Sequence, residues 1–151
     1  TLNREGMPII RYRTHDISRW LTSPCSCGAT TLLRFGKITR RLESIVRVGR
    51  DEIYPTIFDD LIYTIPELVD YQLLVGHKEG RDLLHFTIEV TKEGEKIREA
   101  INKVILSCPI IQKNIGLDKM LPPEVELILQ GALKRSGRAK KLILDERIER
   151  R

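Results

Sequence analysis

The fold of this chain is constrained most by two apolar runs, residues 69–75 and 83–90, which the polar sequence HKEGRD joins. Each run has the length of a strand, and the polar residues between them favour a chain reversal. Apolar residues at helical spacing precede the pair over residues 55–65 and follow it over residues 93–107. A further alternating run covers residues 124–129. We therefore expect an α+β fold in which a three-stranded sheet is covered on one face by two helices.

Turn residues refine this expectation. Residues 44–48 and 52–54 are expected to form a short β-hairpin around Gly49. Pro55 suits the first turn of the helix that follows the hairpin, and Pro109 is expected to end the second helix.

The beginning of the chain has a different pattern and indicates a second structural part. Short apolar runs at residues 7–12 and 31–35 are separated by the turn sequence TSP. These runs are typical of short strands in a β-rich subdomain. We expect residues 1–42 to belong to this subdomain and residues 43–151 to form the compact α+β domain.

Composition restricts the classes of function. Hydrophobic residues make up 41% of the chain, which is enough for a core, and no apolar run approaches the roughly 18 residues of a membrane helix. The net charge of +5 permits an anionic partner, but aromatic residues are few and no nucleic-acid-binding module is recognisable. We therefore expect a cytoplasmic protein that binds neither membranes nor nucleic acids.

A basic segment near the C-terminus indicates contact with an anion. Residues 132–141 read ALKRSGRAKK and follow the last apolar run. The backbone freedom of Gly137 allows close approach to a ligand, and the cations beside it can neutralise phosphate oxygens. The segment therefore suits a ligand that carries phosphate groups.

Short motifs in a fixed order connect this segment to the rest of the chain. They read PIIRYRTHD at residues 8–16, CSCG at 25–28, ITRRLE at 38–43, VGRDEIYP at 48–55 and KRSGRAK at 134–140. In this order they resemble motifs of the adenylate-forming enzyme superfamily, specifically the phenylacetate–coenzyme A ligase branch. The resemblance covers the C-terminal portion of those enzymes.

The resemblance implies a reaction and its cofactors. Such ligases join a carboxylic acid to ATP with release of pyrophosphate, and then transfer the acyl group to coenzyme A. Mg²⁺ accompanies ATP, because the charge of the triphosphate needs neutralising. The expected substrate is an aryl acid such as phenylacetate. The family is several times longer than this chain, its phosphate-binding loop is missing here and the sequence begins at Thr1, so we expect a fragment that is inactive by itself.

The resemblance also implies roles for particular residues. A carboxylate can accept two hydrogen bonds from a ribose diol, which is the implied role of Asp16. Arg41 matches an arginine that contacts the nucleotide, and Glu43 falls on the hinge where the C-terminal domain swings between the two reaction steps. Gly49 and Arg50 stand where the family has two glycines along the coenzyme A channel. Arg50 can narrow that channel or pair with a coenzyme A phosphate.

The basic segment departs from the family pattern at its most important position. The family places a lysine there that bridges the substrate carboxylate and the α-phosphate, and this chain has Arg138. Arginine keeps the charge but presents a planar fork, whereas lysine presents a compact point charge. Lys140 lies two residues further on and takes the role of the family's lysine if the register of the loop shifts.

Cys25 and Cys27 are too close in sequence for a comfortable disulfide, and their match to the family's Cys-x-Cys-Gly raises the possibility of Zn²⁺. Zinc needs about two further ligands, and no second cysteine pair is present. Cys108 lies at a helix terminus, where we expect it to be buried.

Two alternatives to the ligase remain at this stage. Relatives that adenylylate a deazaflavin coenzyme share these motifs, and an obstructed glycine pair fits an enzyme without a pantetheine channel. A non-catalytic nucleotide-binding relative that lost its lysine is the other alternative. Exposed strand edges in residues 1–42 would also allow two copies to pair as a homodimer.

Overall fold

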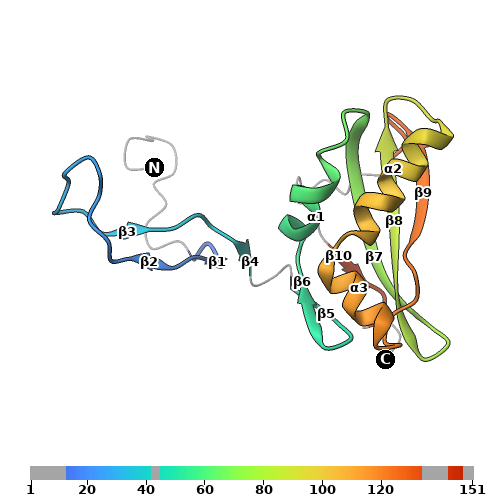
Figure 1. Ribbon diagram of the computed structural model, residues 1–151, viewed down its shortest axis with the longest axis horizontal. Coiled ribbons are helices and arrows are strands. Elements are labelled where there is room, and N and C mark those ends of the chain that lie inside the picture. The colour runs from blue at the N-terminus through green and yellow to red at the C-terminus, as the bar shows by residue number, and fades with distance from the viewer. Residues whose placement is uncertain (1–12, 42–44, 134–142, 148–151) are drawn as a thin grey trace. The chain divides into compact units, whose positions relative to one another are not determined.

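The computed structural model describes residues 13–41, 45–133 and 143–147. The chain divides into two compact units, Thr1–Glu43 and Ser44–Arg151 (Figure 1). Each unit is described by itself below.

The first unit contains short antiparallel strand pairs. Strand β1 pairs with β4, and β2 pairs with β3. The strands are β1 (Asp16–Ile17), β2 (Trp20–Leu21), β3 (Arg34–Phe35) and β4 (Arg40–Arg41). The strand expected within residues 31–35 is therefore present in shorter form, and the one expected at residues 7–12 lies outside the described residues.

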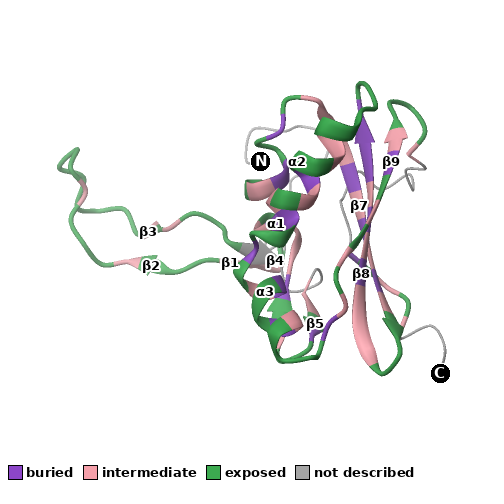
Figure 2. Cartoon of the chain, turned by 45° about the vertical axis from the view of Figure 1, so that its right-hand side comes forward, coloured by how far each residue is buried: buried purple, intermediate pink, exposed green. Residues whose placement is uncertain are grey.

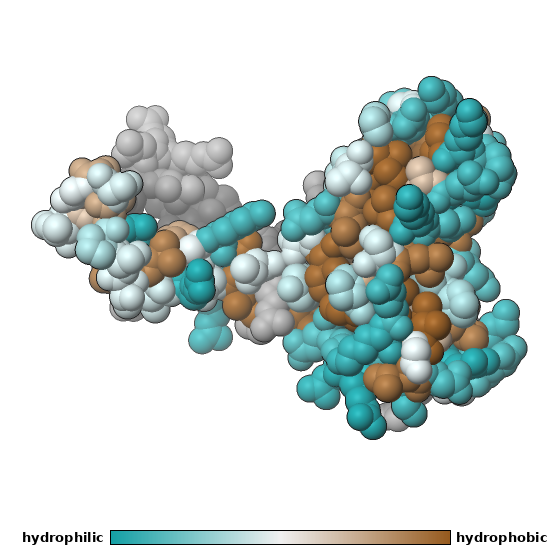
Figure 3. Space-filling model, in the orientation of Figure 1, coloured by the Kyte–Doolittle hydropathy of each residue, from teal (hydrophilic) through white to brown (hydrophobic). Residues whose placement is uncertain are grey.

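Apolar side chains of the first unit face solvent. Trp20, Leu33 and Phe35 have exposed fractions of 67%, 86% and 63%. Apolar side chains are visible on the surface of this unit in Figure 3. No side chain that the structure describes between residues 13 and 39 is fully buried, so these short strands enclose no core of their own.

The second unit is built on a four-stranded sheet with the order β10-β7-β8-β9. Its strands are β7 (Leu68–Lys78), β8 (Arg81–Val90), β9 (Glu124–Leu129) and β10 (Ile143–Asp145). The central strands β7 and β8 are antiparallel, whereas β9 is parallel to β8 and β10 is parallel to β7. The sequence predicted the first three strands but not β10, because a run of three residues is too short to show the alternation of a strand.

The described part of this unit also contains α1 (Pro55–Ile62), α2 (Glu95–Leu106) and α3 (Pro109–Gly116), all on the same side of the sheet (Figure 1). The sequence predicted α1 and α2 and expected Pro109 to end the second helix. Helix α2 does end before Pro109, at Leu106, but a third helix that the sequence did not predict begins at Pro109. Cys108 is extended with ψ of 120°, and a proline at the first helical position loses no hydrogen bond. Cys108 is fully buried, as expected.

The core lies between the sheet and the helices. Figure 2 shows the buried residues on the central strands and on the helix faces that meet them. The buried side chains include Phe58 and Ile62 of α1, Ile101 and Ile105 of α2, and Leu73, Leu84, Phe86 and Ile88 of the sheet. Phe58 and Phe86 pack edge to face with ring centroids 5.2 Å apart, so α1 is fixed directly on β8.

A short hairpin precedes α1. Its strands are β5 (Val46–Val48) and β6 (Asp51–Ile53), close to the bounds that the sequence predicted. Val48 and Ile53 are fully buried in the core described above. The hairpin is therefore part of the second unit, and both of its strands are anchored in the core.

Among the residues that the structure describes, no helix combines the length and the apolar character that crossing a membrane requires.

We predict that Phe86→Ala lowers the free energy of unfolding by about 3–5 kcal/mol, because the residue is fully buried and its ring packs on Phe58. Leu129→Ala is the control, since Leu129 is 53% exposed and its loss should change stability by less than about 0.5 kcal/mol. Urea denaturation followed by circular dichroism measures both. Equal unfolding midpoints for the two variants would contradict this account of the core.

Candidate functional site

The positions predicted to contact a nucleotide are neighbours in the first unit. Strand pairing places Asp16 directly opposite Arg41 in the β1–β4 ladder, although the two are distant in sequence. His15 has a positive φ of 60°, so the chain bends immediately before Asp16. The backbone N–H of Asp16 donates a hydrogen bond to Thr14 Oγ1 at 3.3 Å. The backbone thus brings both predicted positions onto adjacent strands, and their roles stay predictions.

The remaining predicted positions fall into two groups. Glu43, Arg138 and Lys140 lie outside the described residues. Gly49 and Arg50 form the turn of the β5–β6 hairpin, between the paired residues Val48 and Asp51.

The geometry of this turn explains its residues. Gly49 has φ of +59°, and Arg50 is not among the described non-glycine residues with positive φ. A positive φ at only the first central position is the pattern of a type II′ turn, which needs glycine there and accepts a side chain at the next position. Arg50 is therefore compatible with the turn, and its side chain is exposed.

The surroundings of Gly49 also exclude a side chain. A Cβ atom built at Gly49 would overlap Oδ1 of Asn114 and come within 2.9 Å of Asn114 Cγ. Asn114 is fully buried in α3 and faces the turn. Its Oδ1 accepts a hydrogen bond from Arg50 N at 3.4 Å, and its Nδ2 donates to Asp51 Oδ2 at 2.8 Å. Lys113 Nζ binds the other oxygen of Asp51 at 2.8 Å, and the hydrogen bond from Lys113 lowers the pKa of Asp51.

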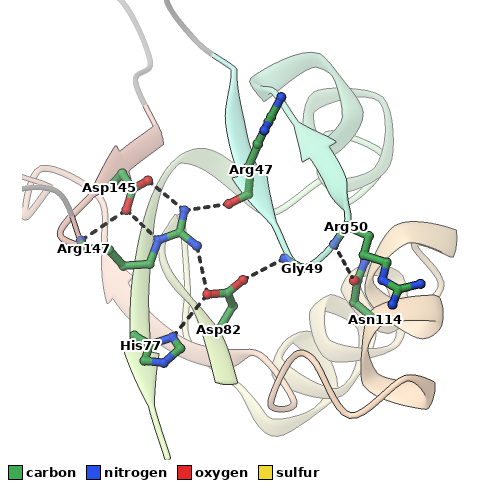
Figure 4. A network of polar contacts seen from close by, with 8 residues as sticks. All are labelled: Arg47, Gly49, Arg50, His77, Asp82, Asn114, Asp145 and Arg147. Carbon is green, nitrogen blue, oxygen red and sulfur yellow. Dashed lines mark hydrogen bonds and ion pairs between the residues drawn. The ribbon is translucent and has the colours of Figure 1, made fainter. Parts of the chain in front are cut away.

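Asp82 fixes the other side of the turn (Figure 4). Gly49 N donates to Asp82 Oδ2 at 2.7 Å, while Arg147 Nη1 donates to Asp82 Oδ1 at 2.8 Å. His77 Nδ1 lies 3.3 Å from the same Oδ1. The Asp82 side chain is only 12% exposed, so these contacts form in a largely desolvated place. One carboxylate therefore joins the turn, the start of β8 and the residues after β10.

Arg147 extends this network to the backbone of β5. Its Nη2 donates to Arg47 O at 2.6 Å and to Asp145 Oδ2 at 2.7 Å, and its Nε donates to Asp145 Oδ1 at 2.8 Å. The hydrogen bonds between Arg147 and Asp145 lower the pKa of Asp145 and raise that of Arg147. The guanidinium fork matches the carboxylate geometry, which favours a rigid contact.

A fully buried carboxylate lies near the far end of β8. Glu89 is 1% exposed, and its Oε1 accepts hydrogen bonds from Gly131 N at 2.6 Å and from Leu133 N at 3.3 Å. Gly131 has φ of +92°, so the chain turns as it leaves β9. In the sequence, Leu133 belongs to the basic segment 132–141, which also contains Arg138 and Lys140.

Cys25 and Cys27 lie in a tight turn of the first unit, with Gly28 N donating to Cys25 O at 3.0 Å. Their Sγ atoms are 3.0 Å apart, and the hydrogen bond between them lowers the pKa of Cys27. Within the described residues no group of three or more cysteine, histidine or acidic residues has the geometry of a metal site. Two sulfurs supply half of a tetrahedral zinc site, so the described residues alone do not fit zinc.

The sequence did not single out Asp82, Asn114, Arg147 or Glu89. Glu89 carried a signal, since it is a charged residue inside an apolar strand, where a carboxylate needs a specific partner. The other three act through contacts between distant segments, which no local pattern reveals.

Comparison with known proteins identifies relatives of the chain. Residues 51–147 match the family described as AMP-binding enzyme C-terminal domain. The phenylacetate-coenzyme A ligase of Thermus thermophilus is 30% identical over 74% of this chain, and that of Aromatoleum evansii is 33% identical over 71%. The Pseudomonas putida phenylacetate-coenzyme A ligase is 26% identical over 98% of the chain. The matched parts are 24%, 24% and 33% of these relatives, so the chain spans at most a third of their length.

A solved structure has a similar fold. The crystal structure of 2-hydroxyisobutyryl-CoA ligase in its postadenylation state matches 93% of this chain with a TM-score of 0.63 and 20% sequence identity. The match covers 30% of that ligase.

We predict that Gly49→Ala destabilises the protein by at least about 2 kcal/mol, because it adds overlap with Asn114 to the strain of a positive φ. Gly80→Ala is the matched control. Gly80 also has a positive φ, of +77°, but no neighbouring atom lies within 4 Å of the added Cβ, so the expected loss is about 1 kcal/mol. Urea denaturation compares them, and an equal loss in both variants would show that Asn114 does not restrict the turn.

We predict that Asp145 contributes to the loss of stability in acid. Because its pKa is lowered in the folded state, the unfolded chain binds more protons at low pH. Its contribution is complete above the ordinary aspartate pKa of about 4 and disappears as the pH falls through the lower folded value. Asp145→Asn should flatten the dependence of the urea midpoint on pH between about 2.5 and 5. The exposed residue Asp60 provides the control, and an equal effect of Asp60→Asn would refute the role of Asp145.

Proposed function

This chain belongs to the family of AMP-binding enzyme C-terminal domains, and from that membership we propose that it is the C-terminal part of an ATP-dependent carboxylate–CoA ligase. In the first step a substrate carboxylate oxygen attacks the α-phosphorus of ATP and pyrophosphate leaves. In the second step the thiol of coenzyme A attacks the acyl carbonyl of the adenylate, and AMP leaves. The observation that carries the proposal is the similarity to phenylacetate-coenzyme A ligases of three organisms.

The exposed apolar residues of the first unit support the proposal that the chain is part of a larger enzyme. Trp20, Leu33 and Phe35 expose most of their surface, which is unfavourable for side chains of this size in a finished domain. Residues 1–42 are proposed to complete the N-terminal domain of the enzyme, and residues 43–151 to form its mobile C-terminal domain. We place the enzyme in the cytoplasm.

We propose that the first unit binds the nucleotide. The Asp16 carboxylate accepts hydrogen bonds from the ribose hydroxyls, and Arg41 contacts the ribose or phosphate. The support is their placement opposite each other on β1 and β4. Mg²⁺ neutralises the triphosphate charge. Glu43 is the proposed hinge between the two reaction steps.

We propose that the turn Gly49–Arg50 serves the second step. A turn without a side chain at its first position lets the pantetheine arm approach the backbone, and the cationic side chain of Arg50 pairs with a coenzyme A phosphate. The exposed position of Arg50 supports this role. The argument for a deazaflavin-adenylylating enzyme was that the Arg50 side chain obstructs the pantetheine channel, whereas the similarity to phenylacetate-coenzyme A ligases supports a ligase. The ligase is therefore preferred.

The proposed cation for adenylation is Arg138, or Lys140 if the loop register shifts, bridging the substrate carboxylate and the α-phosphate. The proposed substrate is an aryl carboxylic acid, because the relatives act on phenylacetate according to their names.

We predict that the complete enzyme catalyses ATP–pyrophosphate exchange with phenylacetate or a related aryl acid, and forms AMP and a thioester when coenzyme A is added. A panel of aryl and aliphatic acids, measured with and without coenzyme A, tests this. Binding of ATP without exchange for any acid would refute the ligase and favour a non-catalytic relative. Exchange without a coenzyme A-dependent thioester would favour an adenylylating enzyme with another acceptor.

ATP–pyrophosphate exchange also identifies which residue supplies the bridging cation. If Arg138 is the bridging residue, Arg138→Ala should slow exchange by about 100-fold, a typical loss for one electrostatic contact to the transition state, while Lys140→Ala changes little. The opposite result would assign the role to Lys140.

A further inference from the structure

Strand β8 carries two carboxylates that are largely shielded from water, Asp82 near its start and the fully buried Glu89 near its end. Asp82 follows its first residue and Glu89 precedes its last. Each accepts hydrogen bonds from the backbone of a segment outside the strand. A buried carboxylate requires such partners, so each contact fixes the segment that provides the donors.

The two carboxylates lie on opposite faces of the sheet. Successive strand residues alternate between faces, and the separation of Asp82 and Glu89 is odd. Asp82 shares its face with the buried residues Leu84 and Phe86, on the side of the helices, while Glu89 shares the other face with Thr87. At a rise of about 3.3 Å per residue, the two positions are separated by about 23 Å along the strand. At that distance the two sites should respond independently to substitution.

Asp82 fixes the turn proposed to face coenzyme A. The N–H of Gly49 points away from the hairpin ladder, and Asp82 Oδ2 is its acceptor at 2.7 Å. The second oxygen is bound to Arg147, so the carboxylate cannot rotate without losing one of its contacts. An asparagine at position 82 would have one oxygen that accepts and one nitrogen that donates, so it could not accept hydrogen bonds from both Gly49 and Arg147.

Glu89 fixes the start of the segment proposed to serve adenylation. A single oxygen accepts from two alternate residues, Gly131 and Leu133, and so sets the direction in which the chain leaves β9. The carbonyl oxygen of glutamine can accept the same two hydrogen bonds, whereas alanine provides none.

We propose that Asp82 and Glu89 are positioning residues that separately serve the two steps of the reaction, Glu89 for adenylation and Asp82 for transfer to coenzyme A. This inference rests on the proposed function. Each acts through the backbone that it fixes, and an error of 1 Å in such placement can slow a reaction by about 100-fold.

The test measures each step by itself in the complete enzyme. ATP–pyrophosphate exchange without coenzyme A reports adenylation, and thioester formation from the chemically prepared acyl-adenylate reports transfer. Glu89→Ala should slow exchange by about 10- to 100-fold and leave transfer within about threefold, because only the adenylation segment is displaced. Asp82→Asn should slow transfer by a similar factor and leave exchange within about threefold.

Controls separate positioning from general damage. Glu89→Gln should restore most of the exchange, since its oxygen can accept both backbone hydrogen bonds. Thr87→Ala removes a side chain from the face of β8 that also carries Glu89, and it should leave both steps unchanged. Thermal unfolding of each variant shows whether a lost activity follows lost folding.

The outcomes distinguish this inference from the function on which it rests. A wild-type enzyme that performs neither step would overturn the proposed function and the inference with it. A wild-type enzyme that performs both, with variants that slow both steps in parallel or slow neither, would overturn the inference alone.

Discussion

The antiparallel pairing of β7 with β8 is the contact on which the second unit depends. Its register places Leu73 opposite Phe86 and Val75 opposite Leu84, so the buried residues of both strands face the same side. The helices α1 and α2 cover that side, and β9 and β10 extend the sheet at its two edges. A shift of one residue would move the apolar residues to the other face of the sheet. The same shift would turn Asp82 away from the hairpin.

Much of this fold could be predicted from local patterns, because long strands and amphipathic helices repeat their apolar residues over many positions. Strands β7 and β8, helices α1 and α2 and the β5–β6 hairpin belong to this class. The short strands β1, β2 and β4 of the first unit were not predicted, and neither were β10 and α3 of the second unit. Three residues are too few to show an alternation, and Pro109 is equally suited to following one helix and to beginning the next.

The candidate site was predictable only where a motif contained it. Gly49 and Arg50 were found through a resemblance, and the structure adds the reason that only the first of them needs to be glycine. Asp82, Asn114 and Arg147 surround the same turn but come from three distant segments. Their polar contacts are set by the packing of elements on one another, which is decided after those elements form.

The hydrogen bond between Arg147 and the backbone of Arg47 joins residues 100 positions apart. A nascent chain emerges from its N-terminal side, so the hairpin leaves the ribosome long before the residue that completes its polar network. The pairing of β10 with β7 must also wait until β10 has been synthesised. Final assembly of the second unit therefore waits for the last part of the domain to be synthesised, and until then one edge of its sheet is open to other chains.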